Sequence, residues 1–218
     1  MRKFEFQTDE YYHIYNRGVD KRQIFIDEND FIRFLTGMRE FNDNSTFEQR
    51  LQKKKELSSK ALELSSFFNQ LPKLVKIISY CLNDNHYHFI LKQLADKGIK
   101  TFMHKLGTGH TNYFNLKYNR SGSLFQGPFK AVHINTNDYL LWLSGYINGN
   151  CQIHGLGNAK NYSWSSYKDY LNLRNGTLCD KKPVLEQFKD LNEYEKFVEM
   201  IIKDSSERKE EYKKYLLE

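Results

Sequence analysis

Two histidines separated by one residue, His86 and His88, stand at the start of a short apolar run. Another apolar run, residues 74–82, precedes them, and residues 83–85 (Asn-Asp-Asn) are typical of a turn. We therefore expect a β-hairpin whose second strand begins with the histidines. Side chains at i and i+2 of a strand share a face, so both imidazoles should point the same way. Such a pair could form half of a metal site; the alternative is two surface histidines on the wet face of a strand.

A second candidate group lies on a predicted helix that begins near Asp138 and ends near Asn150. Trp142, Tyr146 and Asn150 follow one another at intervals of four residues, so they line one face of that helix. A tyrosine and an amide one turn apart, near the histidine pair, would supply a nucleophile and a third metal ligand. A free phenol has a pKa of about 10, so it would need a base or a metal-polarised electrophile. A tyrosine on a helix is more often part of a core, and this alternative stays open.

Basic residues provide candidate contacts to a polyanion. The net charge is +6, with 33 Lys and Arg against 27 Asp and Glu, which favours a polyanionic partner. Arg17, Arg120 and Lys130 lie near glycines in predicted loops, where a cation can approach a phosphate backbone closely. Lys105 occupies an exposed position of a predicted helix. The alternative for each is an ordinary surface charge.

Composition favours a soluble protein of the reducing cytosol. The chain has 218 residues, of which 39% are hydrophobic and 15% aromatic. Three cysteines occur without the spacing of a disulfide framework. The N-terminus lacks the apolar core of a signal peptide, and no apolar run is long enough to span a bilayer. We therefore expect a cytoplasmic protein without a membrane segment.

The remaining elements would position these candidate residues. We expect a strand over residues 11–18, a helix from Glu28 with Asp27 as its N-cap, and a helix over residues 99–118 whose apolar stripe is interrupted by Gly107 and Gly109. A further strand should end near residue 134. The order strand, helix, two strands, helix, strand is that of a ferredoxin-like α+β sandwich, in which helices pack on an antiparallel sheet. The pattern leaves open whether the hairpin strands are central or at an edge.

Two segments fall outside this order. Residues 42–70 are charge-dense with sparse apolar positions, which indicates an exposed helical insertion. Residues 173–218 form a C-terminal helical appendage. In this appendage we expect a helix over residues 191–202, followed by a highly charged end that frays.

The ordered motifs resemble the REP-associated tyrosine transposases, a branch of the HUH single-tyrosine transposase superfamily. Residues 12–18 resemble the first strand of that family, and residues 85–88 (Asn-His-Tyr-His) its histidine-hydrophobic-histidine motif. Residues 146–150 (Tyr-Ile-Asn-Gly-Asn) resemble the tyrosine motif, and residues 164–167 (Trp-Ser-Ser-Tyr) recur after the tyrosine helix. The resemblance implies an HUH-type domain over residues 1–172.

The resemblance implies an enzyme that cleaves and rejoins single-stranded or hairpin DNA. His86, His88 and Asn150 would hold a divalent cation, Mg²⁺ or Mn²⁺. Tyr146 would attack phosphorus, leaving a free 3′-OH and a 5′-phosphotyrosine. Because imidazoles suit softer metals than Mg²⁺, we expect Mn²⁺ to serve at least as well.

The family also suggests a bacterial protein that acts on nucleoid DNA as a monomer or a homodimer. Three alternatives stay open, one of which is a structural protein that needs neither the histidines nor the basic residues. A metal-dependent single-strand nuclease would use the same histidines to activate water. A domesticated DNA-binding protein would keep the basic residues without turnover.

Overall fold

A four-stranded antiparallel sheet with the order β2-β3-β1-β4 forms the centre of the protein. The computed structural model describes residues 5–45, 48–49, 51–52 and 71–215. The strands are β1 (Tyr11–Arg17), β2 (Val75–Asn83), β3 (His86–Gln93) and β4 (Lys130–Ile134). The helices are η1 (Val19–Lys21), α1 (Glu28–Glu40), α4 (Gly98–Lys117), α5 (Asn137–Ile153), α6 (Tyr167–Tyr170), α7 (Lys182–Leu185) and α8 (Leu191–Tyr215). This strand order confirms the predicted ferredoxin-like α+β fold and places the histidine strand, β3, in the middle of the sheet.

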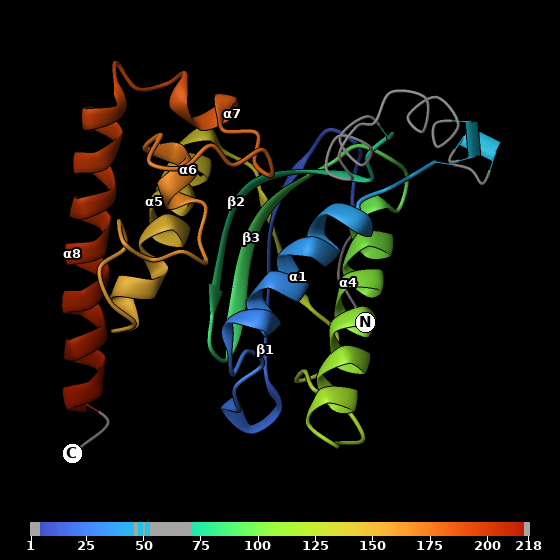
Figure 1. Ribbon diagram of the computed structural model, residues 1–218. Helices are drawn as coiled ribbons and strands as arrows, with labels where there is room; N and C mark the ends of the chain where they lie inside the picture. Colours follow the sequence, from blue (N-terminus) through green and yellow to red (C-terminus); the bar gives the residue numbers. More distant parts are fainter. Residues whose placement is uncertain (1–4, 46–47, 50, 53–70, 216–218) are drawn as a thin grey trace.

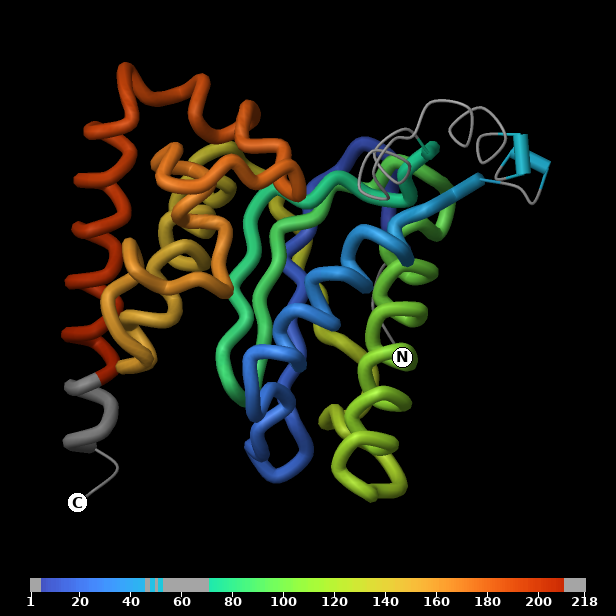
Figure 2. The backbone as a smooth tube through the Cα atoms, viewed as in Figure 1, coloured from blue at the N-terminus to red at the C-terminus, as the bar shows by residue number. Residues whose placement is uncertain are grey.

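Helices cover both faces of the sheet (Figures 1 and 2). Alternate strand residues divide the core in two, because successive side chains point to opposite faces. Ile14 and Phe89 pack with α1 and α4 on one face. Cys81 and Ile90 pack with α5 and α8 on the other, which we call the α5 face. Helix α5 lies between the sheet and α8 (Figure 1). Within the described part of the chain, every helix is too short or too polar to cross a membrane.

Most of the predicted insertion, residues 42–70, lies outside the described residues. Its first residue, Asn42, is buried and connects the end of α1 to the start of β2. The Asn42 amide donates to the Val75 carbonyl at 2.9 Å, and its oxygen accepts from the backbone of Leu74 and Val75 at 3.1 and 3.0 Å. The domain therefore fixes this end of the insertion with buried hydrogen bonds.

The segment after α5 covers the free edge of β2 and ties it to α5. The backbone N–H of Leu82 donates to the Trp164 carbonyl at 2.9 Å, and that of Ser166 donates to the Tyr80 carbonyl at 2.9 Å. The Ser166 hydroxyl donates to the side-chain oxygen of Asn148, on α5, at 2.6 Å. This polar connection fixes α5 relative to the sheet.

Helix α8 continues to Tyr215, so the expectation that it ends near residue 202 is wrong. A contact with α5 accounts for part of the extension. Lys209 donates to the carbonyl of Ile153 at the carboxyl end of α5, at 3.0 Å. A cation is favourable there because the last carbonyls of a helix carry partial negative charge. The two helices also approach closely, since a Cβ on Gly149 would collide with Ile202.

Gly149→Ala is expected to destabilise the fold by about 1–3 kcal/mol, because the added methyl forces Ile202 and α8 away from α5. Gly107→Ala is the matched control. A Cβ there meets no atom within 4 Å, so improved helix propensity alone should stabilise the fold by about 0.5–1 kcal/mol. Chemical denaturation measures both changes. Equal unfolding free energies for the two variants would contradict the close packing of α5 on α8.

Candidate functional site

His86 and His88 lie on the α5 face of the central strand, as their spacing predicted, with ring centroids 5.2 Å apart. The strand register places Arg17 opposite His86 and Tyr15 opposite His88. Tyr15 is in turn opposite Lys130, whose ammonium lies 6.0 Å from the Tyr15 ring centroid. Directly opposite residues of antiparallel strands share a face. Arg17 and Lys130, both predicted to contact DNA, therefore lie on the same face as the histidines.

Helix α5 crosses this face and brings Tyr146 and Asn150 to the histidines. The Tyr146 ring contacts the His88 ring edge-on, with centroids 6.0 Å apart, and stacks on Trp142 with centroids 5.3 Å apart. The side-chain oxygen of Asn150 is 3.4 Å from Nε2 of His86. The structure thus brings together all the residues predicted for nucleophilic attack and for metal binding.

Asn83, which the sequence placed in the hairpin turn, occupies the point where His86 and Asn150 converge. It is the last residue of β2 and lies opposite His86. Its Nδ2 is 2.8 Å from His86 Nε2 and donates to Asn150 Oδ1 at 2.6 Å. His86 Nδ1 is 2.6 Å from Asn85 Oδ1. When Nδ1 of His86 carries the ring proton, it donates to Asn85. Nε2 is then unprotonated, and its lone pair points toward Asn83 and Asn150.

His13 orients the other histidine, a role that no motif in the sequence indicates. His13 Nε2 lies 2.9 Å from His88 Nδ1, and the two rings stack with centroids 5.2 Å apart. One nitrogen of this pair donates and the other accepts, which leaves His88 Nε2 for another partner. A bond of this kind fixes the tautomer and orientation of a metal-binding histidine.

His154 is a further histidine near the site. It is the C-cap residue of α5, and its ring centroid is 4.6 Å from that of His86. Lys209 of α8 lies 3.3 Å from His154 Nδ1. His154 is distant from His86 in sequence, and only the length and direction of α5 bring the two together.

The donor atoms of this site fit a divalent cation held partly by an amide. Among the described residues, no cluster of three or more His, Cys, Asp or Glu side chains could hold a metal. His86 Nε2 and Asn150 Oδ1, however, both point at the Asn83 amide nitrogen, a hydrogen-bond donor that a cation could replace. Nδ2 of Asn150 is buried and has no partner in the described structure. Two imidazoles and an amide oxygen, completed by water or phosphate oxygens, would suit a divalent cation.

Burial keeps the imidazoles of the site neutral. It lowers the pKa of His13 and His86 to about 4, and it lowers the pKa of His88 well below the usual value. Burial also raises the pKa of Tyr146 above its usual value, and the nearby Asn150 partly offsets this rise. Neutral imidazole is the form that binds a metal, and Tyr146 is a protonated phenol at neutral pH.

Stability is expected to fall as the pH drops from about 6.5 to about 4, and His110 allows a direct test. His110 is 3% exposed, its Nε2 donates to the Ile24 carbonyl at 2.8 Å, and burial lowers its pKa to about 4. The unfolded chain therefore binds a proton in this range that the folded chain does not. His110→Gln keeps a donor and removes the titration, so it should reduce the slope of unfolding free energy against pH by about 1.4 kcal/mol per unit. Urea denaturation at several pH values measures the slope; identical slopes for both proteins would contradict a buried neutral His110.

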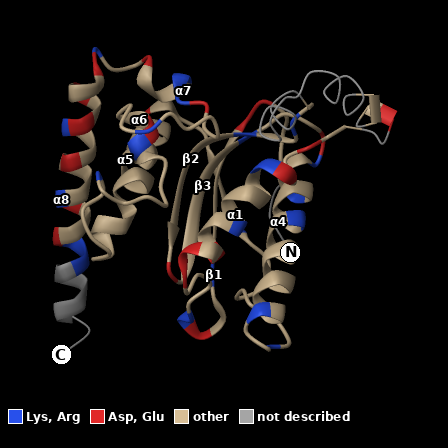
Figure 3. Ribbon diagram, viewed as in Figure 1, with Lys and Arg blue, Asp and Glu red and all other residues tan. Residues whose placement is uncertain are grey.

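Lys105 and Arg120, the other residues predicted to contact DNA, belong to the opposite side of the sheet. Lys105 lies on α4, where Figure 3 marks basic residues in blue, and Arg120 follows that helix. Arg120 donates to the Asn115 side chain at 3.0 Å and lies over the Phe114 ring. A DNA strand in contact with all of the predicted cations would have to pass around the sheet.

Comparisons with known proteins give distant likenesses to solved structures. No protein-family model and no curated protein matches the sequence. A solved structure of a REP-associated tyrosine transposase bound to a REP hairpin is 14% identical; the match covers 83% of this chain and 93% of that chain, with a TM-score of 0.47. A tRNA(His) guanylyltransferase from Saccharomyces cerevisiae is also 14% identical; the match covers 91% of this chain and 80% of that chain, with a TM-score of 0.32.

Proposed function

We propose that this protein cleaves and rejoins single-stranded DNA, linear or in a hairpin, with Tyr146 as the nucleophile. The position of α5 carries the proposal. The helix crosses the α5 face so that the Tyr146 ring touches His88 while Asn150 reaches His86. A nucleophile, paired imidazoles and an amide oxygen therefore surround one place on the sheet.

His86, His88 and Asn150 would hold a divalent cation, Mg²⁺ or Mn²⁺. Such a cation, when bound, polarises a phosphate and offsets the charge that develops during attack. In the absence of a cation, the Asn83 amide nitrogen occupies this place, 2.8 Å from His86 Nε2 and donating to Asn150 Oδ1 at 2.6 Å. His13 holds the His88 ring in a fixed orientation. Arg17 and Lys130, on the same face, are placed to bind the phosphates beside the scissile one.

The proposed chemistry is a transesterification. A bond forms between the Tyr146 phenol oxygen and phosphorus, and the bond from phosphorus to the 3′ oxygen breaks. The phenol loses its proton, and the departing 3′ oxygen gains one. Burial raises the pKa of Tyr146, so the phenol enters the reaction protonated and must lose its proton during the attack. The 5′-phosphotyrosine retains an ester bond, so attack by a 3′-OH can rejoin the strand without a nucleotide cofactor.

Labelled oligonucleotides test this proposal. Linear and hairpin-forming single strands are incubated with the protein and Mn²⁺ and then separated on a denaturing gel. A strand labelled at its 3′ end should become attached to the protein, and a strand labelled at its 5′ end should give a shorter free fragment. Cleavage without attachment would indicate a nuclease that uses water, and binding without cleavage would indicate a DNA-binding protein.

A further inference from the structure

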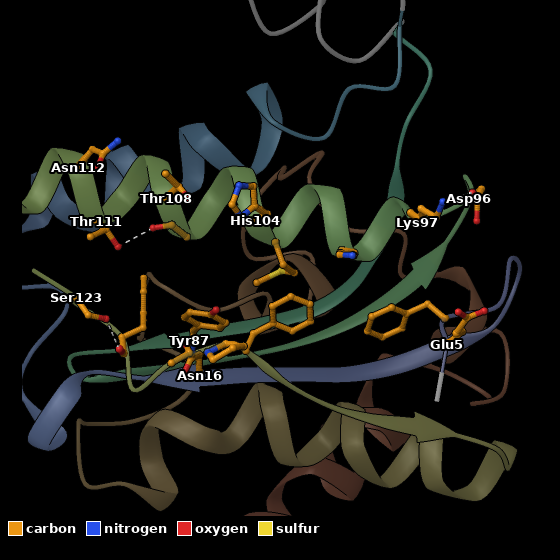
Figure 4. Close-up of a pocket in the computed structure, with 18 residues that line it drawn as sticks. Glu5, Asn16, Tyr87, Asp96, Lys97, His104, Thr108, Thr111, Asn112 and Ser123 are labelled. Carbon is orange, nitrogen blue, oxygen red and sulfur yellow. Dashed lines mark hydrogen bonds and ion pairs between the residues drawn. The ribbon is translucent and has the colours of Figure 1, made fainter. Parts of the chain in front are cut away.

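A cavity of about 830 Å³ lies on the side of the sheet opposite Tyr146 (Figure 4). Helix α4 forms one wall, and β1, β3 and the loop over residues 123–129 form the other. Its volume falls within the roughly 300–1,000 Å³ that is usual for small-molecule and cofactor sites. Nothing in the proposed chemistry uses this cavity.

Gly107, in the middle of α4, keeps the cavity open. Glycine in a helix interior is less favourable than alanine, so its presence at these positions calls for a structural explanation. At Gly109 the reason is packing, because a Cβ would lie 2.8 Å from the Phe41 ring. At Gly107 a Cβ would meet no atom within 4 Å, and the backbone has no positive φ. The missing side chain therefore leaves space in the cavity and serves no packing contact.

The cavity wall combines aromatic rings with polar and basic groups. Phe6 and Phe129 stack with centroids 6.2 Å apart and an interplanar angle of 19°, and Phe125 lines the cavity from the same loop as Phe129. His104 and Lys100 face the cavity from exposed positions of α4. Flat apolar faces with a cation at the rim suit a nucleobase and its phosphate.

Charge distinguishes the two ends of the cavity. Glu5 and Asp96 lie together with Lys97 at one end, whereas Ser123 is toward the other end (Figure 4). Lys97 is 3.8 Å from Asp96, so its charge is partly balanced there. The carboxylates would repel a phosphate chain, so a nucleotide strand should enter from the Ser123 end and meet Lys100, one helical turn from Lys97, with its innermost phosphate.

Strand β1 connects this end of the cavity to the histidine face. Asn16 lines the cavity and holds the loop by donating to the Gly127 carbonyl at 3.0 Å. The next residue, Arg17, lies on the other face opposite His86 and donates to Gln126 at 2.6 Å. A strand that passes the end of β1 can therefore reach both sites.

We infer that the cavity binds unpaired nucleotides of the DNA strand that is cleaved on the other face of the sheet. This inference rests on the proposed function for its choice of polymer. A free nucleotide also carries a flat base and a phosphate, so the experiment compares single strands with free nucleotides. The site would hold bases away from the scissile phosphate and so select which single strands are cleaved.

Gly107→Leu is the decisive variant, because the leucine side chain fills part of the cavity. Its Cβ has no other atom within 4 Å, so the side chain can enter without a clash at its base. Binding of fluorescently labelled, random-sequence single strands is measured by anisotropy in EDTA, so that no cleavage occurs. Gly107→Leu should weaken binding roughly tenfold or more, as expected when a stacked base is displaced. Gly107→Ala adds a single carbon to the same wall of the cavity, so it should weaken binding less than Gly107→Leu does. Thermal unfolding of each variant confirms that it is folded.

Lys100→Glu provides an independent variant at an exposed position of the rim. This variant should weaken binding of the single strand. It should also reduce the slope of log affinity against log salt concentration by about the contribution of one phosphate contact. Lys189→Glu, exposed in the segment before α8, is its control and should have a smaller effect.

Unchanged affinity in both Gly107→Leu and Lys100→Glu would overturn the inference, even if Tyr146 still forms an adduct. Weakened binding in both would support it, even if no strand tested gives an adduct and the proposed cleavage fails. Free deoxynucleoside monophosphates are added as competitors. Displacement of the strand by monophosphates at equal concentration would assign the cavity to a free nucleotide and overturn the inference.

Discussion

Tyr146→Phe is expected to abolish the covalent protein–DNA adduct while folding and DNA binding persist. The change removes one oxygen and keeps the ring, which stacks on Trp142 and contacts His88. Without that oxygen no phosphotyrosine can form. Removal of an essential nucleophile lowers turnover by a factor on the order of 10⁴–10⁶. A denaturing gel of a 3′-labelled strand measures the adduct, and anisotropy of the same strand measures binding.

Tyr139→Phe is the matched control for this prediction. Tyr139 lies on the same helix, with its ring centroid 6.4 Å from that of Trp142, and it lies outside the histidine cluster. Its substitution should leave the adduct in place. Undiminished cleavage by Tyr146→Phe, with water as the acceptor, would show that the protein is a metal-dependent nuclease.

His86→Ala and His88→Ala are each expected to reduce cleavage by roughly 10²-fold or more, because charge stabilisation by a bound cation contributes several kcal/mol. Each should also weaken the binding of Mn²⁺, which calorimetry measures without DNA. Loss of either imidazole leaves one nitrogen ligand and the Asn150 oxygen. Asn150→Ala should have a smaller effect, since water can replace a neutral amide oxygen.

His133→Ala is the control for Mn²⁺ binding. His133 lies on β4 against Tyr12, on the sheet face away from His86, and is paired with Glu10 at 2.9 Å. Its substitution should leave Mn²⁺ affinity unchanged. A cation found bound without contact to His86 or His88 would show that the metal site has been placed wrongly.

The sequence predicts the parts of the site that depend on residue spacing within a single strand or helix. The spacing of His86 and His88 on a strand determines that they share a face, and the spacing of Tyr146 and Asn150 on a helix does the same. The resemblance in motif order then suggested that the two groups meet. Arg17 and Arg120 are basic residues near glycines, and Lys105 is a basic residue on an exposed helical position. Neither property carries information on which side of a sheet a residue lies.

The rest of the site depends on contacts between elements, which a single sequence does not reveal. His13 reaches His88 through the register of β1 against β3. Asn83 belongs to the site because β2 extends one residue further than its apolar run. Gly107 and Gly109 interrupt the same helical stripe, yet one opens a cavity and the other accommodates Phe41. Only the positions of the surrounding atoms distinguish them.

The stacking of Trp142 on Tyr146 also gives the protein an intrinsic optical reporter. The chain has two tryptophans, and the other, Trp164, stacks on Phe31 with centroids 4.6 Å apart, on the face of the sheet remote from Tyr146. Trp142 is 41% exposed, and its indole lies nearly parallel to the phenol of Tyr146, at an interplanar angle of 10°. The excited state of an indole responds to the charge and position of a ring stacked on it. We therefore expect the emission of Trp142 to change when Tyr146 ionises or moves, over a constant contribution from Trp164.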